Sequence, residues 1–324
     1  MKTDSFLFQV VVIAVGLMVI PALTQETYIL HLMILSMVFA IAASNWNLAI
    51  GYGGIFHLAQ VPFFAAGGYA SAILVEHFKL TPWIGLPAGA LAAVVLSIAV
   101  GLPSLRVRGL YLALLTFSFQ FIMLSIVLYF IDITGGDKGL LLPPYKLGNI
   151  VIDLFNVIPS YYMALLIFLA SLLLVRKVID SNIGLALMSL RDSEVYAVSR
   201  GVNPYKMKLA VFVISSIFTG VSGAFYVHYL RVISPAMLEY TLLLIFLTSM
   251  VLGGLGTLYG PLIGAFTLTF LSESLRATEL YRNLIFSALM ILILIFLPKG
   301  LITILTRIWS ELSPTQMKSS SPKG

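Results

Sequence analysis

The sequence predicts an all-α polytopic membrane protein with about ten membrane-spanning helices. Of its 324 residues, 60% are hydrophobic and 10% are charged, and the mean hydropathy is +1.04. A soluble domain of this size could not bury so much apolar surface. The apolar runs approach the roughly 20 residues that cross a bilayer as a helix. They are continuous rather than alternating, which excludes a β-barrel.

The apolar runs follow one another from the N-terminus almost to the end of the chain. They cover residues 6–23, 28–50, 55–75, 83–102, 110–131, 161–175, 207–230, 238–252, 258–271 and 284–297. A long polar segment, residues 132–160, separates the fifth run from the sixth. Residues 1–308 are therefore expected to form a single transmembrane domain. The tail at 309–324 is polar, with Pro, Ser and Lys, and we expect it to be disordered.

The distribution of basic residues predicts the orientation. If the N-terminus is inside and the spans alternate, the inside segments hold 13 of the 19 Lys and Arg residues, and the outside segments hold the other 6. Cytoplasmic loops carry such an excess of basic residues. Both termini and residues 176–208 are therefore predicted to be cytoplasmic, and residues 132–160 periplasmic. The net charge of +6 reflects this bias and does not indicate nucleic-acid binding.

Residues 180–208 form the longest polar interruption with helical character. Apolar residues that recur every three or four positions are Ile183, Leu187, Leu190, Val195, Val198 and Val202. This spacing predicts short amphipathic helices. Asp192 can cap a helix start, and Gly201 followed by Asn203-Pro204 can end one. The segment is either a solvated connector or a docking element for a cytoplasmic partner.

Two glycine-rich stretches break the apolar spans. The first contains Gly51, Gly53 and Gly54 and precedes His57 and Gln60, and the second contains Gly253, Gly254 and Gly256. Broken helices often line a pathway, because the freed backbone groups must face protein or water. These residues are therefore candidates for a translocation path. The alternative is a tight turn with close helix packing through small residues, and both interpretations stay open.

Few ionisable residues lie within the predicted spans. His31 lies in the second span, whereas His228 and Glu239 fall near span ends, where a side chain can reach the interface. No carboxylate lies clearly at mid-span, which argues against a stand-alone, ion-driven secondary transporter. The chain has no cysteine and no recognised catalytic, metal-ligand or phosphate-binding motif. We therefore expect no enzyme activity, metal or cofactor, and an energy source outside the chain.

Several runs resemble one protein family from about residue 35 to residue 301. They are NWNLAIGYGGIFHLAQVPFFAAGGYASAIL, LPSLRVRGLYLALLTFSF, TGGDKGL, SNIGLALMSLRDSEVYAVSRGVNPYKMKLAVFVISSIFTGVSGAFYVHYL, SMVLGGLGTLYGPLIGA and FLPKGL. These runs are similar to the LivM-type permeases of bacterial branched-chain amino acid ABC transporters. The resemblance implies a multi-pass permease of the bacterial inner membrane, with the fold of ten-span ABC importers.

The resemblance also implies a docking site for an ATPase. In related importers the loop after the sixth span carries a coupling helix, and residues 176–208 occupy that place. The loop signature is Glu-Ala-Ala, three residues, then Gly; Ala197 and Gly201 match its last Ala and its Gly, whereas its Glu has no counterpart. If residues 183–201 form one helix, Ala197 and Gly201 lie on one face. The coupling candidates are Arg191, Asp192, Glu194, Ala197 and Gly201.

A heteromeric importer follows from this resemblance. Its expected partners are a second, LivH-like permease, two cytoplasmic ABC ATPase subunits, a periplasmic substrate-binding protein, membrane lipid and an amino acid substrate. The expected substrates are Leu, Ile and Val, but close relatives carry other amino acids, urea or short amides, and the sequence does not decide between them. A sugar ABC permease shares the ten-span plan but matches these runs less well.

Overall fold

The computed structural model describes residues 2–24, 26–107, 109–148 and 150–274, together with 284–285, 288, 291–292 and 300–302. Of residues 2–9 it describes the backbone alone. The predicted tail at 309–324 lies outside the described residues. The predicted span 284–297 also lies mostly outside them, although the few described positions between 284 and 292 are helical.

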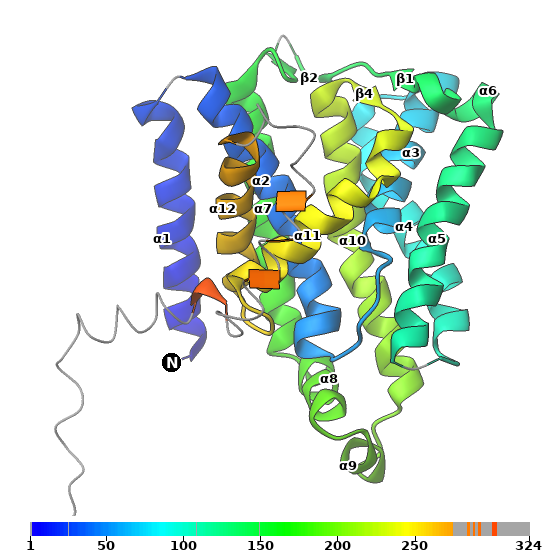
Figure 1. The fold of residues 1–324 in the computed structure, drawn as a ribbon. Helices are drawn as coiled ribbons and strands as arrows, with labels where there is room; N and C mark the ends of the chain where they lie inside the picture. The colour runs from blue at the N-terminus through cyan, green and yellow to red at the C-terminus, as the bar shows by residue number, and fades with distance from the viewer. Residues whose placement is uncertain are drawn as a thin grey trace, which may run out of the picture.

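The described chain is mainly helical (Figure 1). Its α-helices are α1 (Lys2–Leu23), α2 (Thr27–Asn47), α3 (Gln60–Phe78), α4 (Pro82–Ser104), α5 (Leu110–Tyr129), α6 (Ile131–Thr134), α7 (Val157–Ile179), α8 (Asn182–Asp192), α9 (Glu194–Ser199), α10 (Pro204–Leu230), α11 (Tyr240–Gly253) and α12 (Gly260–Ser274). A π-helical turn, Leu48–Tyr52, continues α2. Short 3-10 turns lie at Gly136–Lys138 and Pro235–Leu238.

Five of the described helical segments are long and apolar enough to cross a membrane. They are Thr27–Tyr52, Pro82–Ser104, Leu110–Tyr129, Val157–Ile179 and Pro204–Leu230. The apolar segments Val10–Leu23 and Tyr240–Gly253 are shorter. All seven coincide with predicted spans within a few residues. The predicted polytopic helical architecture is confirmed for this part of the chain.

The predicted span 55–75 begins too early. Helix α3 starts only at Gln60, and the residues from Gly54 to Ala59 are not helical. Gly54 has φ +64°, a value that ends the helical course of the preceding turn. Apolar residues continue through this segment, and an apolar run cannot distinguish a short buried extended segment from a helix.

Helix α2 forms the centre of the structure (Figure 1). Nearly all of its side chains from Leu32 to Asn47 are buried, and it packs against α7, α10, α11 and α12. A mostly apolar helix is expected in such a protein-filled surrounding, and most of its few buried polar residues bond to other parts of the chain or to its own carbonyls. By contrast, α4 and α5 expose large apolar residues such as Leu91, Val95 and Phe121. Those exposed faces suit contact with lipid or with another membrane helix.

Helices α3, α4 and α10 pack together through glycines. Gly220 of α10 lies against the backbones of Gly67 in α3 and Gly89 in α4. Gly223, one turn further along α10, lies against the backbone of Phe64. A Cβ on Gly220 or Gly223 would overlap these neighbouring atoms. The missing side chains allow the helix backbones to approach closely, as small residues do in membrane helix pairs.

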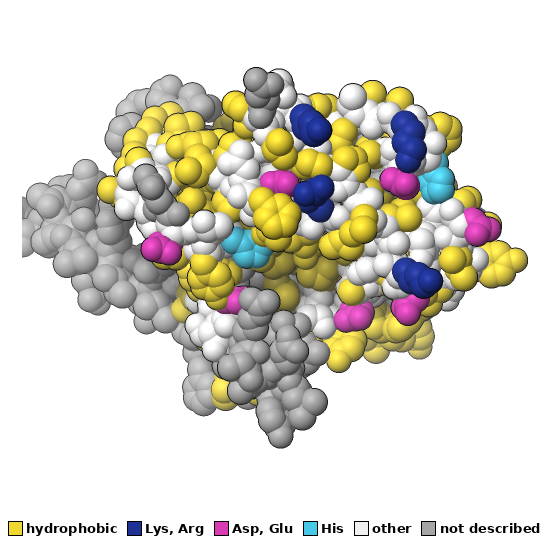
Figure 2. Space-filling model, turned by 90° about the horizontal axis from the view of Figure 1, so that it is seen from above, with side chains coloured by type: hydrophobic (Ala, Val, Ile, Leu, Met, Phe, Trp, Pro, Cys, Tyr) yellow, Lys and Arg dark blue, Asp and Glu magenta, His cyan; other side chains and the backbone are white. Residues whose placement is uncertain are grey.

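Four short strands lie at the end of the molecule opposite α8 and α9 (Figure 1). β1 (Leu140–Leu141) pairs antiparallel with β4 (Val232–Ile233), and β2 (Tyr145–Leu147) pairs with β3 (Ile150–Ile152). The all-α prediction is wrong for these loops, because backbone groups outside helices need partners and short ladders supply them. Figure 2 shows that charged side chains of both signs are scattered among hydrophobic ones on this face.

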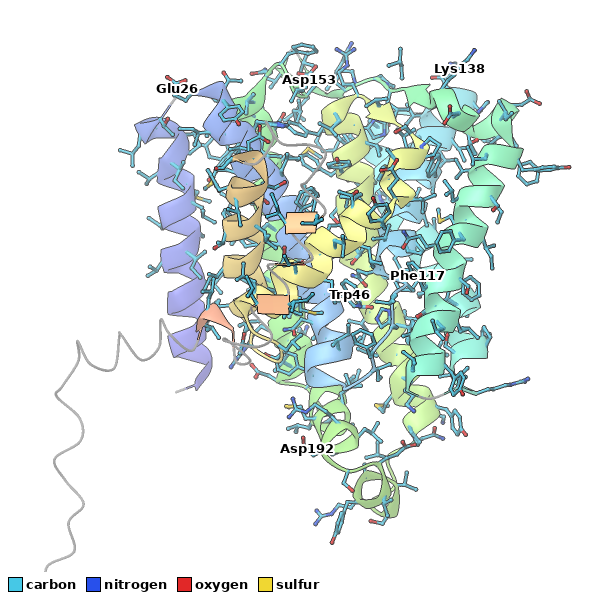
Figure 3. The ribbon with its side chains drawn as sticks, viewed as in Figure 1. Glu26, Trp46, Phe117, Lys138, Asp153 and Asp192 are labelled. Atoms are coloured by element: carbon cyan, nitrogen blue, oxygen red, sulfur yellow. The ribbon has the colours of Figure 1, made fainter. Side chains whose placement is uncertain are left out.

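The helices place two groups of loops at opposite ends. The start of α1 lies at the same end as α8 and α9, which we name the inner end (Figure 1). Asp192 also lies there, whereas Glu26, Lys138 and Asp153 lie at the opposite, outer end (Figure 3). Residues 132–160 and 180–208 are therefore far apart along the helix axes, as the predicted topology requires.

Candidate coupling and translocation sites

The segment predicted as cytoplasmic, residues 180–208, folds into two helices separated by one extended residue. Ser181 Oγ accepts hydrogen bonds from two backbone amides and caps the start of α8. Ser193 has φ −161° and ψ 110°, and its Oγ accepts a hydrogen bond from an amide in the first turn of α9. The prediction that Asp192 caps a helix is wrong. Asp192 is the last residue of α8, and Ser193 is the cap.

Helix α9 ends as predicted. Its last residue is Ser199, and Gly201 has φ +85°. Asn203 Oδ1 then accepts a hydrogen bond from the amide of Lys206, and Pro204 occupies the first position of α10. Residues other than glycine rarely adopt such a positive φ. The prediction that a helix ends at Gly201 is therefore confirmed, and its φ explains why glycine stands there.

Ala197 and Gly201 do not share one helical face. Ala197 is only 3% exposed, whereas Gly201 lies beyond the end of α9 with open space where a Cβ would be. The two residues would share a face only if one helix ran through residues 183–201; instead Ser193 is extended between α8 and α9, and α9 ends at Ser199, before Gly201. The large apolar side chains that α9 exposes are Val195, at 81%, Tyr196, at 76%, and Val198, at 49%. Helix α9 therefore presents apolar side chains away from the chain.

The apolar face of α8 is buried as predicted. Leu187 is fully buried, while Ile183 and Leu190 are partly buried, and α8 packs on α7 and α10. Two of the predicted coupling residues lie at its C-terminal end. Asp192 is exposed there, and Glu194 begins α9. This end of α8 faces the first glycine break.

Arg191 joins α8 to that break. Its Nη1 donates a hydrogen bond to the carbonyl oxygen of Gly51 at 2.9 Å, and its Nε and Nη2 each donate to Asp192 Oδ1 at 3.1 Å. A Cβ on Gly54 would lie 2.8 Å from Arg191 Cγ, so no larger residue fits there without a shift. The structure thus brings together the coupling segment and the first glycine break, which were predicted as separate sites.

The first break is a satisfied helix end rather than an open gap. Three amides donate to carbonyl oxygens of the π-helical turn: Gly53 to Leu48, Gly54 to Ile50, and Ile55 to Ala49. Arg191 supplies the donor for Gly51. Carbonyls in the last turn of a helix have no partner within the helix, so these donors complete the end of α2. Short π-helical turns of this kind often occur at functional sites.

The second break is a tight turn between α11 and α12. Gly253 lies so close to the backbone of Gly260 that a Cβ would overlap it. Gly254 and Gly256 have φ +121° and +70°, values that glycine adopts most readily. The alternative interpretation, a turn with close packing through small residues, therefore accounts for Gly253.

Asn47 connects the second break to α2. Its Oδ1 accepts a hydrogen bond from the amide of Gly256 at 2.9 Å, and its Nδ2 donates to the carbonyl of Thr257 at 2.8 Å. Gly256 also lies against Gly51, where a Cβ on either residue would be crowded. We define Asn47, Gly51, Gly54, Arg191 and Gly256 as the glycine junction. Asn47 was missed by the sequence analysis, although a polar residue in an apolar span is itself a signal.

His57 and Gln60 are fully buried, so neither lines an open path in this conformation. Gln60 Nε2 donates to Thr219 Oγ1 at 2.6 Å, which links α3 to α10. The ring centroid of His57 lies 4.5 Å from that of Phe212. His57 Nε2 and Gln60 Oε1 have no hydrogen-bond partner among the described residues.

A cavity of about 220 Å³ lies beside the glycine junction at the inner end. Its walls include Gly53, Gly54, Arg191, Glu194 and Lys208, from the first break and from α8 to α10. Charged side chains and a glycine backbone thus border the same space. A cavity walled by such separated segments has no signature in the linear sequence.

Two other histidines are hydrogen-bonded in the outer half. The prediction that the His228 side chain can reach the membrane interface is wrong, because this side chain is fully buried. Its Nε2 is bonded to Ser71 Oγ and its Nδ1 to the carbonyl of Pro143, each at 2.8 Å. His31 Nδ1 is bonded to the hydroxyl of Tyr229 at 2.7 Å. These contacts fasten α2, α3 and the outer loops to α10.

Comparison with known proteins places the chain in a transport family. The family described as the permease component of branched-chain amino acid transport systems matches residues 28–295. The high-affinity branched-chain amino acid transport system permease protein LivM of Escherichia coli K12 is 30% identical over 290 residues, covering 83% of this chain and 68% of that protein.

Two further relatives extend the comparison. LivM of Salmonella typhimurium is 29% identical, covering 98% of this chain and 79% of that protein. The permease protein LivH of Escherichia coli K12 is 26% identical, covering 82% of this chain and 91% of that protein. No solved structure matches the chain at the significance applied to these comparisons.

Proposed function

The chain belongs to the permease family of branched-chain amino acid transport systems, and from this premise we propose that it is the LivM-type subunit of an ATP-driven importer. It lies in the bacterial inner membrane and contributes apolar helices that span it. Similarity to both LivM and LivH implies a second permease as its partner. We further propose about ten spans with both termini in the cytoplasm, on the basic-residue count.

The observation that carries the proposed coupling role is the shape of α8 and α9. The two helices project from the inner end, beyond the long apolar helices (Figure 1). Val195 and Tyr196 are exposed on α9, although both have substantial apolar surface. Apolar side chains held outward on a capped, protein-anchored helix are typical of a docking surface. We propose that this surface binds a cytoplasmic ABC ATPase and that the outer end receives a periplasmic binding protein.

The proposed substrates are the branched-chain amino acids, because the similar proteins are named for them. The same permease plan could pass other amino acids, urea or short amides. Uptake of labelled leucine in competition with isoleucine, valine or urea distinguishes these classes. Of the predicted path residues, His57 and Gln60 are buried in this conformation, so a role in the path requires the helices around them to move.

Val195→Asp tests the docking surface. The side chain is 81% exposed, so the change leaves the fold of this chain intact, but it places an unpaired charge in the proposed interface. Such burial costs several kcal/mol, and about 1.4 kcal/mol is tenfold in affinity. We expect co-purification of the ATPases to fall at least tenfold and uptake to fall with it.

The matched control is Leu141→Asp, an equally exposed apolar residue at the outer end. It should retain the ATPases at the wild-type level. Ala197→Asp is not a clean test, because Ala197 is buried within its own chain. Normal uptake and full ATPase retention in Val195→Asp would refute the proposed docking surface.

A further inference from the structure

Arg191 lies near the end of α8, beside α9 with its proposed docking surface, and its guanidinium contacts the first glycine break. Helix α8 is separated from α9 by Ser193 alone, so a displacement of α9 reaches α8 at the position next to Arg191. Arg191 then donates to the Gly51 carbonyl at 2.9 Å. A hydrogen bond with an ionised donor is stronger than a neutral one, so this contact can carry a pull as well as a push.

The Arg191 bond reaches the π-helical turn at the end of α2, where it affects the stability of that helix end. Gly51 lies in the π-helical turn, where the carbonyls before it are already bonded to amides of the following residues. If Arg191 withdrew, the Gly51 carbonyl would lose its donor at the negative end of the α2 helix dipole. The end of α2 therefore has a lower free energy when Arg191 is in place.

The same displacement is passed to the second break. Gly256 lies against Gly51, and Asn47 on the same helix holds the backbone on both sides of the Gly256–Thr257 peptide bond. Movement of the π-helical turn therefore cannot leave the α11–α12 turn unchanged. One side chain from the inner end thus bears on both places where the membrane helices are interrupted.

The Arg191 guanidinium has space to move, and Asp192 orients it toward Gly51. The Arg191 side chain is 40% exposed and borders the 220 Å³ cavity, so the guanidinium can move without entering packed core. Asp192 Oδ1 accepts from Nε and Nη2 and leaves Nη1 directed at Gly51. Gly54 removes the side chain that would otherwise block this approach.

We propose that Arg191 is the positioning residue that transmits movement of α8 and α9 to the two glycine breaks, rather than a residue that binds the ATPase itself. This inference rests on the proposed function. It assigns Arg191 an internal partner, the Gly51 carbonyl, and it assigns the two glycine breaks one common control. Docking and coupling are then separable, because α9 binds the ATPase and Arg191 transmits the resulting movement to the membrane helices.

The test uses the assembled transporter in proteoliposomes, with Arg191→Met, Arg191→Lys and the control Arg106→Met. Arg106 is an exposed arginine in the turn after α4, also at the inner end, outside α8 and α9. Three quantities are measured: ATPase co-purification, ATP hydrolysis, and substrate taken up per ATP hydrolysed. Coupling free energies between sites typically correspond to factors of about 5–150.

We expect Arg191→Met to keep the ATPases and their hydrolysis while the substrate taken up per ATP falls about fivefold or more. Arg191→Lys should give an intermediate ratio, because one ammonium keeps the charge but cannot reproduce the fork that reaches both Gly51 and Asp192. Arg106→Met should keep the wild-type ratio. A residue that only stabilised the fold would lower yield without changing this ratio.

Loss of the ATPases in Arg191→Met would overturn the inference by making Arg191 a docking residue. A wild-type ratio in that variant would overturn it too. If Arg191→Met does not assemble, Arg191→Lys decides, and a wild-type ratio there counts against the inference. Failure of the wild-type chain to retain any ATPase would instead refute the proposed function.

Discussion

The glycine junction depends on the absence of single atoms. Gly51 has no space for a Cβ, because Asn47 Oδ1 and the backbone of Gly256 occupy it. Gly16 in α1 is the opposite case, with no atom within 4 Å of where its Cβ would be. Two glycines in apolar helices of one chain therefore carry very different constraints, which the letter G alone does not reveal.

Gly51→Ala should damage transport but leave the docking surface intact. The added methyl group forces Asn47 or Gly256 to move, and overpacking of this kind typically costs about 1–3 kcal/mol. We expect lower thermal stability in detergent and at least a tenfold loss of uptake, with the ATPases still bound. Gly16→Ala is the control and should match the wild-type chain in all three measurements. Wild-type uptake in Gly51→Ala would contradict the packing seen here.

At the residue scale the sequence identified the special positions better than their partners. Gly201 was correctly predicted to end a helix, because a glycine two residues before Asn-Pro is a local signal. The partner of Arg191 lies 140 residues away in the chain, and no local pattern specifies such a contact. Asn47 is one of two asparagines near the end of α2, and the sequence does not distinguish it from Asn45, whose Nδ2 donates to Ser171 Oγ instead.

At the element scale, glycines also determine how three helices assemble. Gly220 allows α10 to lie against both α3 and α4, so one position supports two interfaces. No exposed face is involved, and a larger residue at 220 cannot turn toward lipid. The stability of this three-helix unit is therefore more sensitive to Gly220 than to any exposed residue of α4 or α5.

Gly220→Val should prevent stable assembly of the membrane domain. Its branched side chain would meet the backbone of Gly89 and the Cβ of Ala93 at distances below normal contact. We expect a large fall in the yield of monodisperse protein in detergent, measured by size-exclusion chromatography. Gly16→Val serves as the comparison and should give a normal yield. Equal yields for the two variants would mean that the helices can separate at no cost.

Length and hydropathy predicted most helices, because crossing a bilayer imposes a minimum apolar run. The errors lie where the backbone leaves helical angles without a change of composition. Ser193 is extended between two helices whose apolar residues have similar spacing, and the segment from Gly54 to Ala59 continues an apolar run into α3, although Gly54 and Phe56 are exposed. Ser193 leaves helical angles to cap α9 with its own side chain, whereas the segment from Gly54 to Ala59 makes contacts distant in the chain, such as the hydrogen bond from the Leu58 amide to Thr116 Oγ1.

At the scale of the whole molecule, the structure separates two sets of loops by the length of the helices. Asp137 is exposed at the outer end and Asn182 at the inner end. The pattern of Lys and Arg predicted this separation, and it also predicts which end faces the cytoplasm.

Single cysteines can measure this orientation, because the chain has none of its own. In intact cells a membrane-impermeant maleimide should label Asp137→Cys but not Asn182→Cys. Ser319→Cys, in the polar tail, should behave like Asn182→Cys if the number of spans is even. Permeabilised cells provide the control, since all three should then react. Labelling of both Asp137→Cys and Asn182→Cys from outside intact cells would refute the proposed topology.

The pairing of β1 with β4 joins the two ends of the chain segment between them into a closed loop. This loop runs from the outer end through α7 to α8 and α9 at the inner end, and returns through α10 to the outer end. Beyond the strands, the amides of Leu142 and Leu154 donate to the carbonyls of Arg231 and Tyr229, and Arg231 pairs with Asp153 at 3.5 Å. Helices α7 and α10 are thus held together at their outer ends by these contacts. The inner end formed by α8 and α9 can therefore tilt about these outer contacts, but α7 and α10 cannot slide past one another along their axes without breaking them.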